Sequence, residues 1–233
     1  MSTVAALPLV AWQGYRVRRN LTQAPTPVGS SSGSTGPHPA MRLAVIGEST
    51  AAGCGVENYE DSIAAAFARC LADRRGHDVS WFVLGQDGAT SRRILHRLMP
   101  DLADGWDLVV LLAGVNDVLS RRRPAEWRAN LEAILHGLEA RSRLVVVAGL
   151  PTFAEFPQLP VALSRYLDRR ARALDRVAEQ VCQQRDHAVW VGSEGVEAGP
   201  DFFAIDGFHP SAEGYRQWAN LLCERLFDSV RGP

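Results

Sequence analysis

From Met41 onward, short apolar stretches alternate with amphipathic stretches, and this alternation constrains the fold more than any other feature of the chain. The expected strands span residues 42–46, 79–84, 108–113, 144–148 and 188–191. The expected helices span residues 61–75, 91–99, 124–140, 160–185 and 211–227. Continuous runs of Val, Leu and Ile indicate strands that are covered on both faces. The pattern therefore predicts an α/β fold, a three-layer α/β/α sandwich around a five-stranded parallel sheet.

Residues 1–40 differ from the rest of the chain because they contain no Asp or Glu. Residues 24–40 are rich in Pro, Gly, Ser and Thr and too poor in apolar residues to build a core. We therefore predict an N-terminal arm and linker over 1–40 and a single domain over 41–233. Arg16, Arg18 and Arg19 follow the apolar start, which is the reverse of a secretory signal. This order favours a cytoplasmic protein, with secretion and peripheral membrane association as open alternatives.

Composition argues against several classes of partner. The formal net charge of −1 gives no field that would gather nucleic acid. No apolar run approaches the roughly 20 residues of a transmembrane helix. The four cysteines form no CxxC pair, and the histidines form no HxH or HExxH motif, so we expect neither a metal site nor another cofactor. The sequence leaves the oligomeric state open.

Polar clusters follow the first three predicted strands, and one more precedes the last helix. They span residues 47–50, 85–90, 114–117 and 206–210. In an open parallel sheet, ligands bind beyond the carboxyl ends of the strands. We therefore expect these clusters to meet at one edge of the sheet.

Three residues of these clusters fit an activated nucleophile. The Ser49 hydroxyl needs a base to accept its proton, and His209 is suited to this role. Asp206 lies three residues before His209, so one compact loop can bring its carboxylate to the imidazole and fix the tautomer. The oxyanion would need preset donors. The candidates are the Ser49 N–H, the N–H of a glycine after the second strand, and the Asn116 side chain.

With these four clusters, the sequence resembles the SGNH hydrolases, also called the GDSL esterase/lipase family. The resemblance covers the predicted domain but not residues 1–40. It assigns Ser49 as the nucleophile, Gly88 and Asn116 as oxyanion donors, and Asp206 and His209 as the DxxH pair. It implies a flavodoxin-like fold, hydrolysis of a small-molecule carboxylic ester, and no cofactor.

Two positions depart from or complicate the family pattern. The first block reads GEST rather than GDSL, so Glu48 stands in place of Asp and Thr50 in place of Leu. The second block offers Gly85 as an alternative to Gly88.

The GxSxG string at residues 29–33 lies in the linker without a preceding strand, so we reject it as a nucleophile elbow. We interpret Cys54 as a small residue in a tight loop.

The substrate is less constrained. Phe153, Phe156 and Leu159 follow the fourth strand and either line an acyl pocket or pack inward, and Phe208 near the triad raises the same question. Acyl transfer to an alcohol, thioester hydrolysis and carbohydrate O-deacetylation would need the same triad. A nucleotide-binding module is disfavoured because no GxGxxG or GxxxxGK[ST] loop is present.

Overall fold

The computed structural model contains a six-stranded sheet in the order β1-β3-β2-β4-β5-β6. It describes residues 12–13, 16, 22–196, 198–199 and 201–230, so most of the predicted arm lies outside the described residues. The five predicted strands are present as β2 (Met41–Gly47), β3 (Val79–Gly85), β4 (Trp106–Leu112), β5 (Ser142–Ala148) and β6 (Ala188–Val191). These five strands pair in parallel, as predicted. Their order is that of a flavodoxin-like sheet.

The sixth strand corrects the predicted count of five. β1 (Ser32–Ser34) comes from the linker and pairs antiparallel with the outer edge of β3. Thr35 continues this contact by donating its N–H to the Val79 carbonyl at 3.0 Å. An edge strand offers unpaired N–H and C=O groups, and pairing with them requires backbone rather than apolar side chains. A segment without core-forming residues can therefore extend the sheet.

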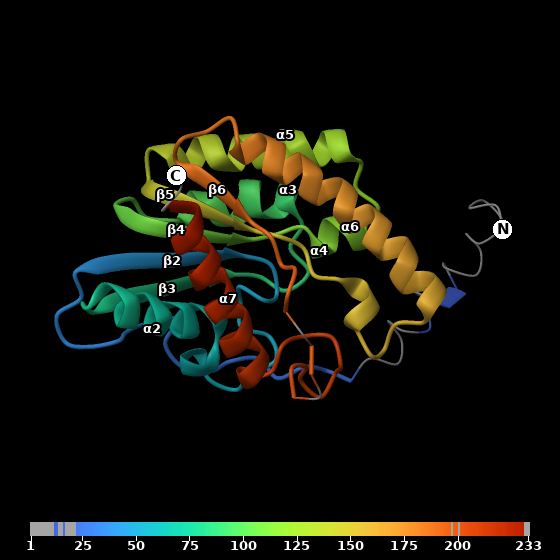
Figure 1. Cartoon of the computed structure of the whole chain (residues 1–233), viewed down its shortest axis with the longest axis horizontal. Helices are drawn as coiled ribbons and strands as arrows, with labels where there is room; N and C mark the ends of the chain where they lie inside the picture. The colour runs from blue at the N-terminus through green and yellow to red at the C-terminus, as the bar shows by residue number, and fades with distance from the viewer. Residues whose placement is uncertain (1–11, 14–15, 17–21, 197, 200, 231–233) are drawn as a thin grey trace.

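Helices cover both faces of the sheet (Figure 1). α2 (Ile63–Arg75) and α7 (Ala212–Val230) pack on one face, while α5 (Pro124–Glu139) and α6 (Val161–Cys182) pack on the other. Side chains along β2 alternate between these two cores: Leu43 and Val45 face α2 and α7, whereas Ala44 and Ile46 face α5 and α6. This alternation follows from the two-residue repeat of a strand. The predicted three-layer architecture is thus confirmed.

Two regions differ locally from the prediction. The helix expected over 91–99 is divided into α3 (Ser91–Arg93), a π-helical turn (Ile94–Leu98) and a 3₁₀ turn (Met99–Asp101). The polar cluster after β4 forms a short helix, α4 (Val115–Leu119). Short 3₁₀ turns also form at Tyr59–Asp61 and Phe153–Glu155. Brief elements of this kind carry too few residues for a detectable hydrophobic period.

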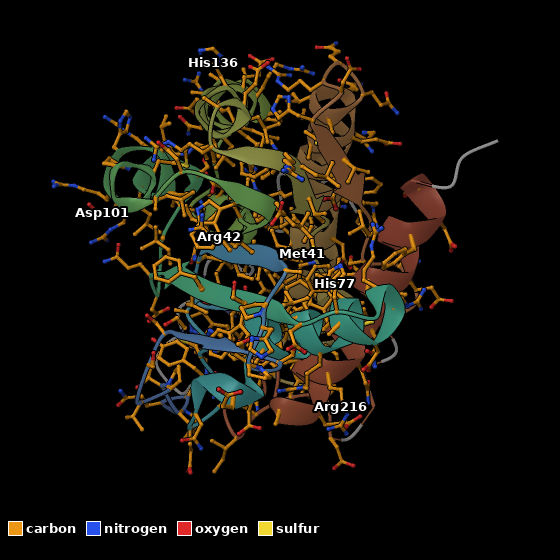
Figure 2. The ribbon with its side chains drawn as sticks, turned by 90° about the vertical axis from the view of Figure 1, so that its left-hand side faces the viewer. Met41, Arg42, His77, Asp101, His136 and Arg216 are labelled. Atoms are coloured by element: carbon orange, nitrogen blue, oxygen red, sulfur yellow. The ribbon has the colours of Figure 1, made fainter. Side chains whose placement is uncertain are left out.

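The end of the sheet where the strands begin is closed by local contacts. Met41 and Arg42 lie there in Figure 2, near His77 on the turn before β3. The Arg42 guanidinium lies 4.6 Å from the centre of the Trp106 ring and donates to the Gly105 carbonyl at 2.9 Å. The polar clusters lie at the opposite end of the sheet, because they directly follow the ends of β2, β3 and β4. Within the described part of the chain, no helix combines the length and the apolar character that a membrane crossing requires.

Candidate active site

Ser49, His209 and Asp206 form one continuous hydrogen-bonded relay. His209 Nε2 lies 2.9 Å from Ser49 Oγ, and His209 Nδ1 lies 2.6 Å from Asp206 Oδ2. Ser49 and Asp206 are buried, and the imidazole between them is partly buried. Both ring nitrogens are thus engaged, so Asp206 determines which tautomer presents an unprotonated Nε2 to the serine. Such an arrangement can remove a proton from Ser49 Oγ.

The loop that carries Asp206 and His209 is built around the Asp206 carboxylate. Its Oδ1 atom accepts the backbone N–H groups of Phe208 and His209 at 2.9 and 3.0 Å. Gly207 between them has φ of +62°, and a Cβ at this position would lie 2.7 Å from Gln158 Cγ. Both restrictions favour glycine. The loop therefore fixes the aspartate and the histidine relative to each other before substrate arrives.

Asp206 carries the negative charge that holding the His209 ring requires. Burial acts to raise its pKa, but the hydrogen bonds from the His209 ring and from two backbone N–H groups outweigh burial and lower the pKa below its ordinary value. Asp206 is therefore ionised throughout the neutral range and can stabilise an imidazolium at His209.

Ser49 lies on a tight turn at the end of β2. Ala52 and Cys54 donate their N–H groups to the carbonyls of Glu48 and Ser49, each at 3.0 Å. The turn packs against the histidine loop so closely that a Cβ on Gly55 would lie 2.1 Å from the Pro210 carbonyl oxygen. Glycine at this position lets two backbone segments touch, and it brings the serine within reach of His209.

Glu48, next to Ser49 in the chain, has a buried carboxyl group that accepts from three donors. Its oxygens accept the backbone N–H of Val115 at 3.1 Å, the backbone N–H of Asn116 at 3.0 Å and Asn116 Nδ2 at 2.9 Å. Burial raises its pKa to about 7, although these hydrogen bonds oppose the shift. Glu48 therefore ties the end of β2 to the start of α4 and orients the Asn116 amide.

The three predicted oxyanion donors have distinct environments. Among the described residues, the N–H groups of Ser49 and Gly88 donate no hydrogen bond. Gly88 has φ of +69°, and the space around its Cα is open. A Cβ on the alternative, Gly85, would instead lie 2.2 Å from the Ala52 nitrogen, so Gly85 has a packing role. One Asn116 amide hydrogen is used by Glu48, and the other is available for a ligand.

A cavity of about 80 Å³ opens beside Ser49 and His209. Its walls include the side chains of Leu112, Ala148, Leu150, Phe156, Phe202, Phe203, Phe208 and Trp218. Phe156 is the hub of the aromatic wall, because its ring centre lies 5.1 Å from that of Phe203 and 5.2 Å from that of Phe208. Phe153 does not line the cavity. It is fully buried and stacks behind Phe156 at 5.3 Å.

Two carboxylates of α6 hold the loop that forms another wall of the cavity. Asp168 Oδ1 accepts the Phe153 N–H at 2.7 Å, and Asp175 Oδ1 accepts the Leu150 N–H at 3.0 Å. These aspartates lie two helical turns apart, so they share one face of α6. Burial raises the pKa of Asp175 to about 6. The shape of the cavity wall thus depends on helix α6.

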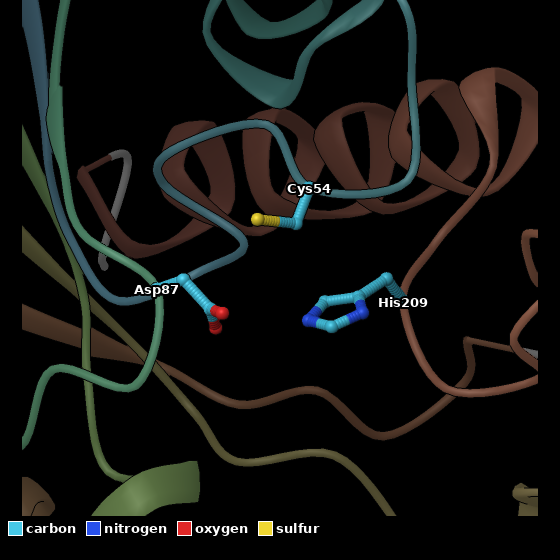
Figure 3. Close-up of side chains that lie close together, drawn as sticks. All are labelled: Cys54, Asp87 and His209. Atoms are coloured by element: carbon cyan, nitrogen blue, oxygen red, sulfur yellow. The ribbon is translucent and has the colours of Figure 1, made fainter. Parts of the chain in front are cut away.

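A cluster of polar side chains also meets at His209. Figure 3 shows Cys54, Asp87 and His209 converging, and their ligand atoms lie within 4.8 Å of one another. Metal binding here would require a thiolate, yet burial and the nearby carboxylates of Asp87 and Asp206 raise the pKa of Cys54 to about 11. It would also require a His209 nitrogen that Ser49 and Asp206 already engage. The cluster does place the Asp87–Gly88 turn beside the His209 ring.

Sequence reasoning did not assign roles to Glu48, Asp168 or Asp175. Glu48 was visible only as a departure from the GDSL pattern, and its partners are more than 60 residues away in the chain. Asp168 and Asp175 lie on the otherwise polar flank of an amphipathic helix. Their seven-residue spacing on one face of that helix is the signal that could have found them.

Residues 45–217 match the family of GDSL-like lipases and acylhydrolases. Over 197 residues, which are 82% of this chain, the sequence is 26% identical to the GDSL-like esterase Rv1075c of Mycobacterium tuberculosis. The chain spans 63% of the length of that relative.

Solved structures have the same fold. The crystal structure of TesA is similar with a TM-score of 0.64 and 27% sequence identity, over 82% of this chain and 98% of that chain. AlinE4, an SGNH-hydrolase family esterase, is similar with a TM-score of 0.59 and 24% identity, over 84% of this chain and 99% of that chain. The likeness to AlinE4 is at the level of the fold.

Proposed function

Because the chain belongs to the family of GDSL-like lipases and acylhydrolases, we propose that it hydrolyses carboxylic esters with Ser49 as the nucleophile. The observation that carries this proposal is the relay from Asp206 through both nitrogens of His209 to Ser49. In this proposal His209 is the general base and acid, and Asp206 holds and stabilises its ring.

The reaction has two steps in this site. Ser49 Oγ attacks the ester carbonyl carbon while His209 Nε2 takes the hydroxyl proton. The tetrahedral intermediate collapses when His209 returns that proton to the departing alcohol, which leaves an acyl group on Ser49. Water then attacks the acyl-enzyme with His209 again acting as base, and the acid is released. Atoms and charges balance without a cofactor.

Three donors stabilise the negative oxygen of each tetrahedral intermediate in this proposal. They are the N–H groups of Ser49 and Gly88 and the free amide hydrogen of Asn116. The two N–H groups have no protein acceptor among the described residues, which leaves them available to an oxyanion. Glu48 keeps the Asn116 amide in place, so the hole needs no reorganisation when charge develops.

The cavity beside Ser49 is the proposed acyl site. Phe156, Phe208 and Leu150 give it an apolar lining, and Glu48 and Glu155 are its only ionisable lining residues besides His209 in the described part of the chain. Two acidic groups disfavour an anionic acyl chain and accept an uncharged one. The substrate class that fits is therefore an ester whose acyl group is uncharged and apolar.

The test is hydrolysis of p-nitrophenyl esters from acetate to palmitate by the wild type and by Ser49→Ala. We expect wild-type turnover with a chain-length optimum, and a loss of at least about 10⁴-fold in kcat in a folded Ser49→Ala variant. Ser229→Ala, an exposed serine near the end of α7, is the matched control. Full activity in Ser49→Ala would refute the nucleophile assignment.

Acyl transfer uses the same acyl-enzyme and is resolved by product partition. When an alcohol is added to the ester assay, a hydrolase releases mostly free acid, whereas a transferase forms mostly the new ester. Predominant ester formation at low alcohol concentration would replace hydrolysis by transfer as the proposed reaction.

A further inference from the structure

Two cysteines face each other where α2 packs on α7. Cys70 on α2 packs against the core cluster that contains Cys223 of α7. The contact is repeated one helical turn later. There the guanidinium carbons of Arg74 and Arg75 lie 5.4 and 4.9 Å from the centre of the Phe227 ring. Cys70 and Cys223 each lie about one helical turn before these residues, so the two thiols lie on the facing sides of α2 and α7.

The two thiols have unequal environments. Cys70 is partly exposed, whereas Cys223 is fully buried. A hydrogen bond from Cys223 and the charge of Arg74 lower the pKa of Cys70, despite its partial burial. The neighbouring Cys70 sulfur and burial raise the pKa of Cys223. An accessible thiolate beside a protected thiol is the arrangement of a redox-sensitive pair.

We propose that Cys70 and Cys223 form an intramolecular disulfide when the protein meets a hydroperoxide, with Cys70 as the residue that reacts first. The Cys70 thiolate attacks one peroxide oxygen, the O–O bond breaks, and protonation of the leaving hydroxide gives water and a sulfenic acid at Cys70. Cys223 then attacks the Cys70 sulfur, the S–O bond breaks, and a second water leaves. In sum, two thiols and one hydrogen peroxide give one disulfide and two waters.

This disulfide would join the two helices that flank the catalytic loops. α2 follows the Ser49 turn in the chain, and α7 begins three residues after His209. The bond would close a long loop between distant parts of the sequence, which restricts the unfolded chain. The oxidised protein is therefore expected to have a higher Tm than the reduced protein. The proposal is independent of the esterase assignment.

The test is to treat the purified full chain with a small excess of hydrogen peroxide at neutral pH. The remaining thiols are alkylated and non-reduced peptides are mapped by mass spectrometry. We expect thiols per chain to fall from four to two, with one cross-linked peptide pair containing Cys70 and Cys223. Cys54 and Cys182 are buried with pKa values raised to about 11 and about 12, so they should remain reduced.

Variants separate the two roles. Cys70→Ser should lose no thiol to peroxide, whereas Cys223→Ser should form a sulfenic acid at Cys70 that dimedone traps. Cys182→Ser, matched for burial, should form the same disulfide as the wild type. Over-oxidation of Cys70 while Cys223 stays reduced would overturn the proposal, as would a disulfide between two chains or one that involves Cys54. Because peptide mapping of the wild type needs no variant, the test stands even if a variant misfolds.

Discussion

Glu48 has the most unusual environment of any single carboxylate in the site. It is almost fully buried, which disfavours its charge, yet three donors from Val115 and Asn116 converge on it. The burial effect is larger, because the pKa of Glu48 is raised to about 7. Near neutral pH the protonated and ionised forms therefore coexist, and the ionised form accepts the three hydrogen bonds more strongly.

Replacing Glu48 by Gln should weaken catalysis and flatten the pH dependence of stability. The Gln amide nitrogen would face a backbone N–H or the Asn116 amide, so Asn116 shifts and kcat should fall by about 10- to 100-fold. Because the folded pKa lies above the ordinary value, Glu48 costs stability as pH rises from about 4.5 to about 7. Fully developed, this cost is about 3 kcal/mol.

Urea unfolding of the wild type and of Glu48→Gln across this pH range measures the effect. The free energy of unfolding of the wild type should decline relative to the variant as pH rises. Glu48→Asp, which keeps the charge, should retain more activity than Glu48→Gln. Parallel pH curves for the wild type and Glu48→Gln would contradict the burial argument.

Asp206→Asn tests the tautomer argument. An Asn side chain can keep the loop hydrogen bonds through its oxygen, but it no longer demands a proton on His209 Nδ1 and cannot stabilise the imidazolium. We expect kcat for a p-nitrophenyl ester to fall by about 10⁴-fold with little change in Tm. Asp201→Asn, an exposed neighbour, should leave kcat unchanged. A drop of less than tenfold for Asp206→Asn would show that the carboxylate has no such role.

At the scale of single residues, the sequence best predicts relations between residues that are close together in the chain. Asp206 and His209 were predictable as a pair because three residues separate them, and Ser49 because it follows a strand. The role of Glu48 was not predictable, since it depends on β2 and β4 lying side by side. The inward packing of Phe153 was an open alternative, because periodicity does not say which of two nearby aromatic rings faces a cavity.

Among the elements, α6 is both a layer of the sandwich and the support of the cavity wall. Its Asp168 accepts the Phe153 N–H inside the protein, at a point that water does not reach. Asp168→Ala should leave this donor without a partner and destabilise the fold by about 1–3 kcal/mol. It should also change the acyl-chain preference, because the loop behind Phe156 loosens.

Chemical denaturation and the p-nitrophenyl ester series together measure both effects of Asp168→Ala. Asp73→Ala, on the exposed side of α2, is the control and should change stability by less than about 0.5 kcal/mol. An unchanged chain-length profile in Asp168→Ala would show that this α6 carboxylate does not affect the acyl-chain preference.

The prediction of elements succeeded where hydrophobic patterns were long. All five parallel strands were found because each is a short stretch made mostly of apolar residues, and the long helices because they are amphipathic. β1 was missed because edge pairing uses backbone groups that no composition reveals. α4 was missed because its five residues make less than two turns, and its first residues carry polar groups of the site.

At the scale of the whole molecule, residues 22–40 belong physically to the domain. Besides β1, the Pro25 carbonyl accepts the Gly55 N–H at 2.8 Å, and Val28 donates to the Glu57 carbonyl at 3.0 Å. Both contacts reach the segment that follows Ser49. The predicted boundary at residue 41 therefore cuts through contacts to the segment that follows Ser49.

Two truncations test this boundary. Removal of residues 1–40 should lower Tm and reduce ester hydrolysis, because β3 loses its edge partner and the Ser49 turn loses two hydrogen bonds. Removal of residues 1–21 leaves these contacts in place and should preserve more of both properties. Equal Tm and equal kcat for the two truncations would mean that residues 22–40 are only a linker.

The central claim is that His209 and Asp206 activate Ser49 as a covalent nucleophile, and labelling with a fluorophosphonate tests it most directly. We predict that the wild type gains one phosphonyl group, that peptide mapping places it on Ser49, and that labelling slows strongly in His209→Ala. A stable adduct on another residue, or labelling of Ser49 at the same rate without His209, would contradict the account.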